Sequence, residues 1–196
     1  MEPPVKQSDN NSFIDFDVLF ARLNELLAIK NITLDIICTG GYVMQMNGYR
    51  ATADIDAFYQ SDETINNLIK IVGDEFGLNT PNDLWLNNSV ANMNPLPPDA
   101  YCEIVRQSSH LLVKKVNLIY LIGMKLYSAR GQDMKDIADI LKDNATIQPF
   151  ELISELNLMG FDIDISLILD AFEGAYGMDW LKDFYLKNEA KLLDYF

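Results

Sequence analysis

Two short motifs in the first third of the chain, Gly40-Gly41 and Asp54-Ile55-Asp56, restrict what this sequence can fold into. The glycines follow a β-rich run from Thr33 to Cys38, and two successive glycines let the backbone turn sharply and approach a ligand closely. The segment from Ala53 to Tyr59 alternates with the period of a β-strand, which places the two aspartates on one face. The sequence therefore predicts a strand, a tight turn and a second strand that presents two neighbouring carboxylates.

The chemistry of these motifs points to a metal ion and a phosphate group. Two adjacent carboxylates repel each other, and a hard divalent cation such as Mg²⁺ is their usual partner. Carboxylate-bound magnesium together with substrate phosphates is the arrangement that phosphoryl-transfer sites use. If a helix begins near Tyr42, the backbone N–H groups after Gly41 form an anion site suited to a nucleoside triphosphate, and Thr39 adds a hydroxyl. The simpler alternative is a structural turn followed by a solvated strand face.

The remaining pattern predicts an α+β fold: a small mixed sheet flanked by helices, with an all-helical C-terminal part. Apolar residues at helical spacing predict a helix from Phe16 to Ile29, and Asn82 to Met93 is expected to form a further helix. Tyr101–Arg106 and Leu111–Val116 are expected to pair as a hairpin, and from Asn117 onward the pattern is helical. The expected parts are a polar, proline-containing disordered tail (1–12), a core (13–116) and a helical C-terminal region (117–196).

Composition and charge argue against several classes of protein. The net charge of −14, from 29 acidic and 15 basic residues, opposes non-specific binding to nucleic acid. Cys38 and Cys102 are expected to be free buried thiols in a reducing cytosol, and two cysteines with one histidine argue against a structural zinc site. The sequence has no apolar run of about 18 residues and no secretory-signal pattern at its N-terminus, so we expect a cytoplasmic protein without a membrane span.

Residues 32 to 143 resemble a known group of proteins. An apolar strand, Gly-Gly, about a dozen residues and then Asp-x-Asp on a second strand resemble the nucleotidyltransferase (polymerase-β-like) superfamily. Within it, the run from Arg50 to Asp56 is similar to the Arg-x-Thr-x-Asp-x-Asp motif of AbiEii-type nucleotidyltransferases of bacterial abortive-infection and toxin–antitoxin systems, and of their uncharacterised relatives. A second similarity lies downstream, in a group motif Lys-Leu, Ala-x-Arg, Asp-x-x-Asp that corresponds here to Lys125-Leu126, Ala129-Arg130, Asp133 and Asp136.

The resemblance implies a minimal nucleotidyltransferase fold and the Mg²⁺-dependent transfer of a nucleotidyl group from a nucleoside triphosphate to an acceptor. Asp54 and Asp56 would hold magnesium, the two glycines would line the phosphates, and Lys125 would lie near the nucleotide as a point charge. In the superfamily a third carboxylate on a following strand completes the metal site, and Glu103 is the candidate for it here. The implied acceptor is an RNA such as tRNA, or a protein hydroxyl, and an antitoxin would be a further partner.

Four other charged residues have both a functional and a structural interpretation. Arg50 is a candidate phosphate contact or the ion-pair partner of a nearby acid. Arg130 is a candidate nucleotide-binding residue or a cation that stabilises a helix C-terminus. Asp133 and Asp136 suit the start of a helix, and we expect them to brace Lys125 or Arg130 rather than to act on substrate.

Three hypotheses of function follow from these observations. The first is an active nucleotidyltransferase that modifies RNA or protein as a toxin of a bacterial defence system. The second is a catalytically weak, nucleotidyltransferase-like module that binds nucleotide or a partner protein, and it predicts that no third carboxylate joins the acid pair. The third is a helical structural protein in which Asp-x-Asp is incidental, and it predicts that replacing Asp54 and Asp56 with alanine changes no ligand binding.

Overall fold

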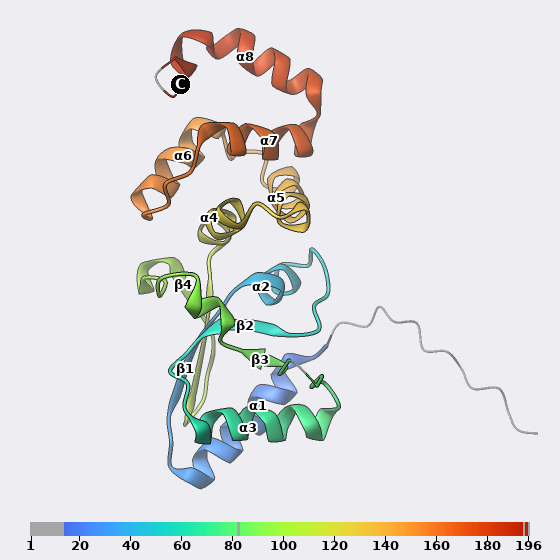
Figure 1. Cartoon of the computed structure of the whole chain (residues 1–196), viewed down its shortest axis with the longest axis vertical. Helices are drawn as coiled ribbons and strands as arrows, with labels where there is room; N and C mark the ends of the chain where they lie inside the picture. Colours follow the sequence, from blue (N-terminus) through green and yellow to red (C-terminus); the bar gives the residue numbers. More distant parts are fainter. Residues whose placement is uncertain (1–13, 82, 194, 196) are drawn as a thin grey trace, which may run out of the picture. The chain divides into compact units, whose positions relative to one another are not determined.

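The protein is described by a computed structural model that covers residues 14–81, 83–193 and 195, so the expected disordered tail (1–12) lies outside the described residues (Figure 1). Two compact units follow each other along the chain, the first ending at Lys115 and the second beginning at Val116. The predicted α+β fold, with a small mixed sheet and an all-helical C-terminal part, is confirmed. Within the described ranges, no helix is long and apolar enough to cross a membrane.

The first unit contains a mixed sheet, helices and two 3-10 helices. Its elements in chain order are α1 (Phe16–Lys30), β1 (Leu34–Cys38), α2 (Gly40–Met46), β2 (Ile55–Phe58), α3 (Glu63–Phe76), β3 (Leu86–Asn87), η1 (Ser89–Asn92), η2 (Asp99–Tyr101), β4 (Cys102–Gln107) and β5 (Leu111–Val116).

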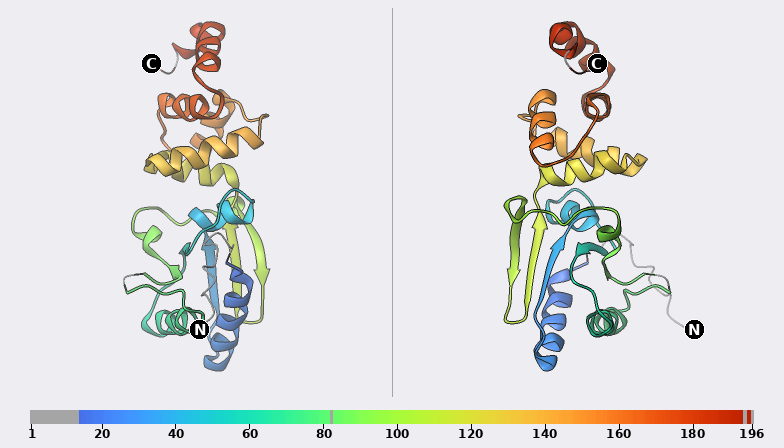
Figure 2. Two further views of the ribbon diagram at one scale, coloured as in Figure 1. Left: turned by 90° about the vertical axis from the view of Figure 1, so that its right-hand side faces the viewer. Right: turned by 60° about the vertical axis from the view of Figure 1, so that its left-hand side comes forward.

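The sheet has the strand order β3-β2-β1-β5-β4. β1 runs antiparallel to β2 and parallel to β5, with Cys38 opposite Ala57 on one side and Lys115 on the other. Figure 2 shows β1, β5 and β4 next to one another, and β4 and β5 form the predicted hairpin. The two motifs thus lie at neighbouring strand ends: Thr39 separates β1 from Gly-Gly, and Asp54 immediately precedes β2, which contains Asp56. The expected strand from Ala53 to Tyr59 is therefore shorter, and Asp54 lies outside it.

One face of the sheet closes on a hydrophobic core against α1 and α3. Leu34, Ile36 and Cys38 of β1 point into this core, and Ile55 and Ala57 of β2 do the same. Because side chains alternate along a strand, the opposite face receives the intervening residues of both strands. Those residues are Asp35 and Ile37 of β1 and Asp56 and Phe58 of β2.

The helix predicted between Asn82 and Met93 is wrong for the residues that the structure describes. Leu86 and Asn87 form β3, which pairs with β2, and a short 3-10 helix follows. Trp85 is fully buried and its indole N–H donates to the carbonyl of Ile69 at 2.8 Å, which anchors the strand to α3. Asparagine side chains also bond locally instead of supporting a helix, as when Oδ1 of Asn87 accepts from the N–H of Ser89 at 3.2 Å.

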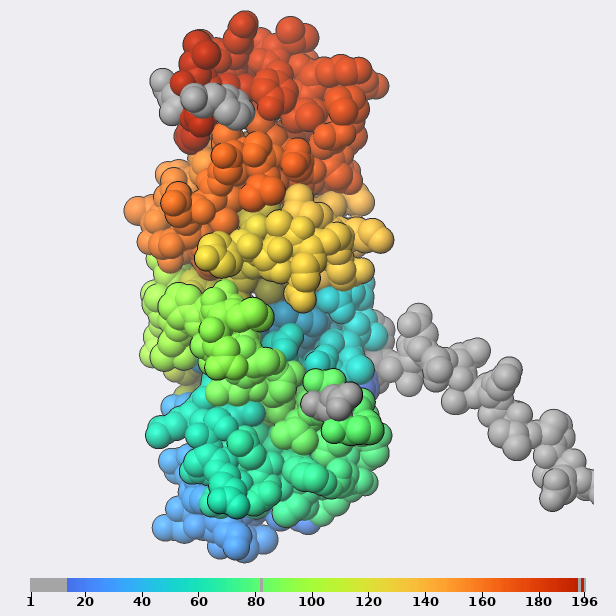
Figure 3. All heavy atoms as spheres, in the orientation of Figure 1, coloured from blue at the N-terminus to red at the C-terminus, as the bar shows by residue number. Residues whose placement is uncertain are grey.

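The described part of the second unit consists of helices. They are α4 (Leu118–Ser128), α5 (Gly131–Asp143), α6 (Pro149–Leu158), α7 (Ile165–Tyr176) and α8 (Met178–Leu192). α5 packs on α4 and α7, and α7 also contacts α6 and α8. In the space-filling view of Figure 3, the atoms of α6 and α7 (orange) and α8 (red) form a continuous surface within this unit. Its aromatic side chains form a stack, with ring centroids of Phe172 and Trp180 5.3 Å apart and those of Trp180 and Phe184 5.1 Å apart.

Candidate functional site

The turn between β1 and α2 brings Gly40 against a carboxylate. Gly40 opens α2 with a φ of +58°, a left-handed conformation that favours glycine. A Cβ placed on this residue would lie 2.9 Å from Oδ2 of Asp56, closer than real Cβ contacts. Glycine is therefore favoured at position 40 for two reasons: the positive φ of the backbone, and the close approach of the Asp56 carboxylate.

The second glycine packs against the segment that precedes β2. A Cβ on Gly41 would lie 2.4 Å from Oγ1 of Thr52 and 3.5 Å from Nη1 of Arg50. The same Thr52 hydroxyl donates to the carbonyl of Asp54 at 3.1 Å and lies 3.3 Å from its Oδ1. Arg50, Thr52 and Asp54 therefore gather around Gly41, as Asp56 does around Gly40.

The backbone fixes the two motifs to each other. The N–H of Thr39 donates to the carbonyl of Asp56 at 2.9 Å, which locks the end of β1 to β2. Thr39 itself is buried, whereas Asp54 and Asp56 are half-buried and reachable from solvent. The structure thus brings together Thr39, Gly40, Gly41, Arg50, Asp54 and Asp56, all of which the sequence singled out.

Gln45 is a residue that sequence reasoning missed. Its side chain on α2 accepts a hydrogen bond from the N–H of Thr52 at 3.0 Å and donates to the carbonyl of Ile14 at 2.8 Å. It therefore holds the segment before the acid pair against α2. Its position four residues after Gly41, on the same helix face, is the signal that could have found it.

The carboxylates of this site fit magnesium that arrives with a triphosphate. Among the described residues, no group of three His, Cys, Asp or Glu side chains is arranged to hold a metal ion. Mg²⁺ is commonly bound through one or two carboxylates together with substrate phosphates, and it keeps several waters. Asp54 and Asp56 can supply such a pair of carboxylates, and both are half-buried and reachable from solvent.

Glu103 is not brought to the acid pair. It lies on β4 at the edge of the sheet, three strand spacings from β2, which is roughly 14 Å. Its carboxylate pairs with Nζ of Lys115 at 2.7 Å. The role of Glu103 as third metal ligand therefore stays a prediction, and the geometry gives it no support.

Lys125 has its described partners inside the second unit. Its side chain is only 6% exposed, and its ammonium lies 2.9 Å from Oδ1 of Asp133 and 2.6 Å from Oδ2 of Asp136. The expectation that these two acids brace Lys125 is confirmed. Asp136 also accepts from Gln132 at 2.8 Å, so its two oxygens are both engaged. Two carboxylates already neutralise Lys125, so its expected contact with nucleotide stays a prediction.

Arg130 is tied to the same cluster but reaches solvent. Its Nε donates to Oδ2 of Asp133 at 2.7 Å while 78% of its side chain is exposed. It precedes α5 as the N-cap residue, so the expected helix start at Asp133 is shifted to Gly131. Ser128 donates to the same carboxylate at 2.9 Å. Of the two cations of this cluster, Arg130 is the one exposed to an external anion.

A low pH should weaken the ion-pair cluster around Lys125. Burial raises the pKa of Asp133, but hydrogen bonds from Arg130 and Lys125 outweigh it and hold the pKa below its usual value. The lowered pKa means that Asp133 contributes stability above the carboxyl's unfolded pKa and loses it as the pH falls through the folded value. We expect the midpoint of urea unfolding to fall more steeply below about pH 4 in wild type than in Asp133→Asn. Asp139→Asn, an exposed change on the same helix, should keep the wild-type slope, and equal slopes in all three proteins would contradict the assignment.

A family model described as nucleotidyltransferase of unknown function (DUF6036) matches residues 15–154. The chain belongs to this family. The matched residues include both motifs of the first unit and the Lys125 cluster of the second. Membership of DUF6036 supports the nucleotidyltransferase superfamily and does not extend to the AbiEii-type group. No curated protein and no solved structure matches the chain.

Proposed function

We propose that this DUF6036 protein transfers a nucleotidyl group from a magnesium-bound nucleoside triphosphate to an acceptor hydroxyl. The observation that carries the proposal is the contact between the glycine turn and the acids: Gly40 lies against the carboxylate of Asp56, and Gly41 lies against the Thr52 hydroxyl that bonds Asp54. A triphosphate bound at this turn would lie beside the two carboxylates. Arg50, next to Gly41, supplies a positive charge at the same place.

The proposed reaction forms one bond and breaks one. The acceptor oxygen attacks the α-phosphorus, the bond from the α-phosphorus to the oxygen bridging it to the β-phosphorus breaks, and pyrophosphate leaves. The hydroxyl proton passes to Asp54, Asp56 or water. Magnesium, when bound, supplies charge neutralisation and alignment of the phosphates. The protein's own part is to hold the two carboxylates and the turn in fixed geometry through Thr39, Thr52 and Gln45.

One observation favours a second candidate, a catalytically weak module that binds nucleotide or a partner protein. The described residues offer two carboxylates at the site and not three, and Glu103 is paired with Lys115 instead. A two-carboxylate site can retain nucleotide while activating the acceptor poorly. A toxin role, an RNA or protein acceptor and a cognate antitoxin are finer proposals that rest on the AbiEii-type resemblance alone.

Incorporation of label tests the proposal. Wild-type protein is incubated with Mg²⁺, each α-³²P-labelled nucleoside triphosphate and fractions of a bacterial lysate separated into RNA, protein and small molecules. We expect label to enter one fraction, and Asp54→Asn to reduce this by about 1,000-fold, as loss of a metal-bearing carboxylate removes most of the charge stabilisation. Glu155→Gln, an exposed change on α6, is the matched control and should match wild type. Triphosphate binding without transfer to any fraction would favour the second candidate.

A further inference from the structure

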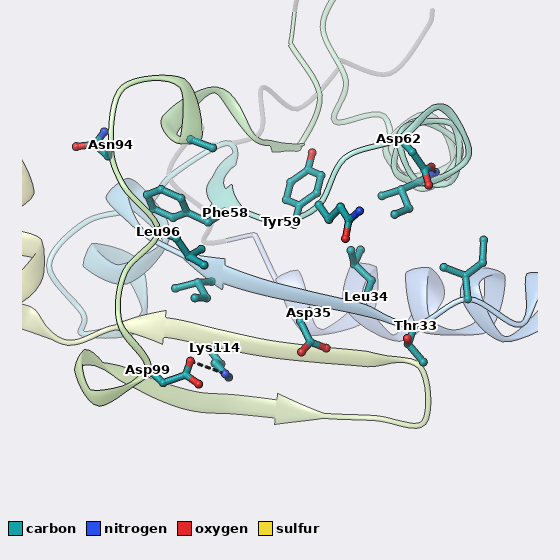
Figure 4. Close-up of a pocket in the computed structure, with 15 residues that line it drawn as sticks. Thr33, Leu34, Asp35, Phe58, Tyr59, Asp62, Asn94, Leu96, Asp99 and Lys114 are labelled. Atoms are coloured by element: carbon teal, nitrogen blue, oxygen red, sulfur yellow. Dashed lines mark hydrogen bonds and ion pairs between the residues drawn. The ribbon is translucent and has the colours of Figure 1, made fainter.

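A cavity of about 870 Å³ lies in the first unit, against the sheet face opposite the core (Figure 4). β1, β2 and β5 form one side, and the connector from Asn94 to Asp99 passes along its edge. This volume lies in the range of small-molecule sites. The polar and aromatic side chains used below are Asp35, Phe58, Tyr59, Asp62, Asp99 and Lys114.

The cavity lies two residues along β2 from Asp56, although neither Asp54 nor Asp56 lines it. Phe58, which lines it, follows Asp56 by two residues on β2, so both side chains project from the same face. Two residues along a strand span about 6–7 Å, the length of a small substituent. A molecule that extends past Phe58 by this length reaches Asp56, where the transfer is proposed to occur.

The lining is negatively charged. Asp35, Asp62 and Asp99 face a single ammonium, that of Lys114, which leaves a net of two negative charges. Lys114 is already paired with Asp99 at 2.8 Å, and Asp62 accepts from the N–H of Ile65 at 2.7 Å as the cap of α3. Asp35 is exposed at the cavity, as Figure 4 shows. This negative potential attracts ammonium groups and repels phosphates. The chain's net charge of −14 has the same effect on both kinds of group.

The aromatic part of the lining suits a ring-shaped, partly polar ligand. Phe58 ends β2 and is buried, whereas Tyr59 follows it and is half-buried against the core. Burial raises the pKa of Tyr59 to about 12, so its phenol stays neutral. Aromatic faces attract ammonium groups and pack against the apolar faces of saturated rings. The exposed part of Tyr59 therefore favours the same ammonium-bearing molecules as the negative charge of the cavity.

We propose that this cavity binds the acceptor, and that the acceptor is a small molecule carrying both hydroxyl and ammonium groups. The inference rests on the proposed nucleotidyl transfer and names its substrate class: the acceptor oxygen bonds to the α-phosphorus, its proton leaves to water or a carboxylate, and pyrophosphate departs. The ammonium groups pair with Asp35 and with the wider negative field of the cavity. A polyphosphate strand is a poor acceptor here, because it would meet this field with charge of the same sign.

Binding is measured by calorimetry on the full chain without nucleotide or metal, using three probes. The fully deacetylated chitosan trimer carries hydroxyls and ammonium groups, maltotriose is its neutral counterpart, and a short RNA oligomer represents the anionic class. We expect the chitosan trimer to bind at least about tenfold more tightly than maltotriose, and more weakly at high salt. Asp35→Asn and Thr33→Arg, both changes at exposed residues of the cavity, should each weaken binding about three- to tenfold. Asp83→Asn, an exposed aspartate that does not line the cavity, should leave it unchanged.

The outcomes separate this inference from the proposed function. Equal binding of the chitosan trimer and maltotriose, or binding that Asp35→Asn and Thr33→Arg leave unchanged, would overturn the inference. If the RNA oligomer binds, and if Asp35→Asn increases its affinity and Thr33→Arg increases it further, the inference is overturned in favour of a nucleic-acid acceptor. If no probe binds while triphosphate still binds, the inference fails and the proposed function stands. If the trimer binds as expected but no triphosphate is consumed, the cavity is a ligand site and the proposed function fails.

Discussion

Replacing Lys125 with methionine should lower the free energy of unfolding of the protein by about 3–5 kcal/mol. The change leaves the carboxylates of Asp133 and Asp136, each at most 5% exposed, without the ammonium that lies within 2.9 Å of both. Asp133 keeps its ion pair with Arg130, so most of the cost comes from Asp136, and a buried charge that loses its ion-pair partner costs far more than a lost surface pair. Urea denaturation of the full chain followed by circular dichroism measures the change.

A matched control comes from the neighbouring helix. Lys135 lies on α5 and is exposed, so Lys135→Met removes the same charge but should change the free energy of unfolding by less than about 0.5 kcal/mol. Adding Asp136→Leu to Lys125→Met should recover part of the loss, because it removes one of the stranded charges. A loss below about 1 kcal/mol in Lys125→Met would mean that the cluster is not the buried ion-pair network described above.

Gly40→Ala should reduce transfer by about 100-fold while leaving a folded protein, because displacement of a reacting group by about 1 Å is enough for such a loss. The new Cβ would lie 2.9 Å from Oδ2 of Asp56 and would push this carboxylate away from the turn. The backbone strain of alanine at positive φ adds about 1 kcal/mol of destabilisation. Transfer is measured by label incorporation, and triphosphate affinity by calorimetry.

Gly48 provides the control that separates strain from contact. Its φ is +80°, and a Cβ there would meet no atom within 4 Å. Gly48→Ala should therefore cost similar stability but keep transfer and triphosphate affinity within about twofold of wild type. If both variants lose activity equally, backbone strain alone explains the loss, and the contact between Gly40 and Asp56 has no functional meaning.

The local features of the fold could be predicted from the sequence because short-range physics decides them. Pro149 at the first helical position marks the start of α6, within the stretch after Asn117 that was expected to be helical. The strand period of Ala53–Tyr59 predicted β2, which is shorter and contains Asp56 but not Asp54, and the hairpin of β4 and β5 was also predicted. Five of the six residues gathered at the glycine turn followed from these local patterns, and Arg50 from the family resemblance.

Long-range pairing could not be predicted from the same patterns. β3 forms because Leu86 pairs with Ile55 of β2. A strand of two residues is too short to show the alternation by which strands are recognised in a sequence. Glu103 was a reasonable third acid on a following strand, but sequence gives no strand order, and β4 lies at the edge beyond β5. The cavity is equally non-local, since its residues come from β1, β2, β5, α3 and the connector.

Metal binding measured with and without a triphosphate tests the central claim most directly. Mn²⁺ replaces Mg²⁺ and is titrated into the full chain by electron paramagnetic resonance, in the presence and absence of a non-hydrolysable α,β-methylene triphosphate analogue. Because Asp54 and Asp56 are two carboxylates and not a complete cage, the ion should bind weakly alone and at least about tenfold more tightly with the analogue. Asp56→Asn should abolish this gain, and Asp83→Asn should keep it. Metal affinity that is the same with and without the analogue, or that Asp56→Asn leaves unchanged, would contradict the account.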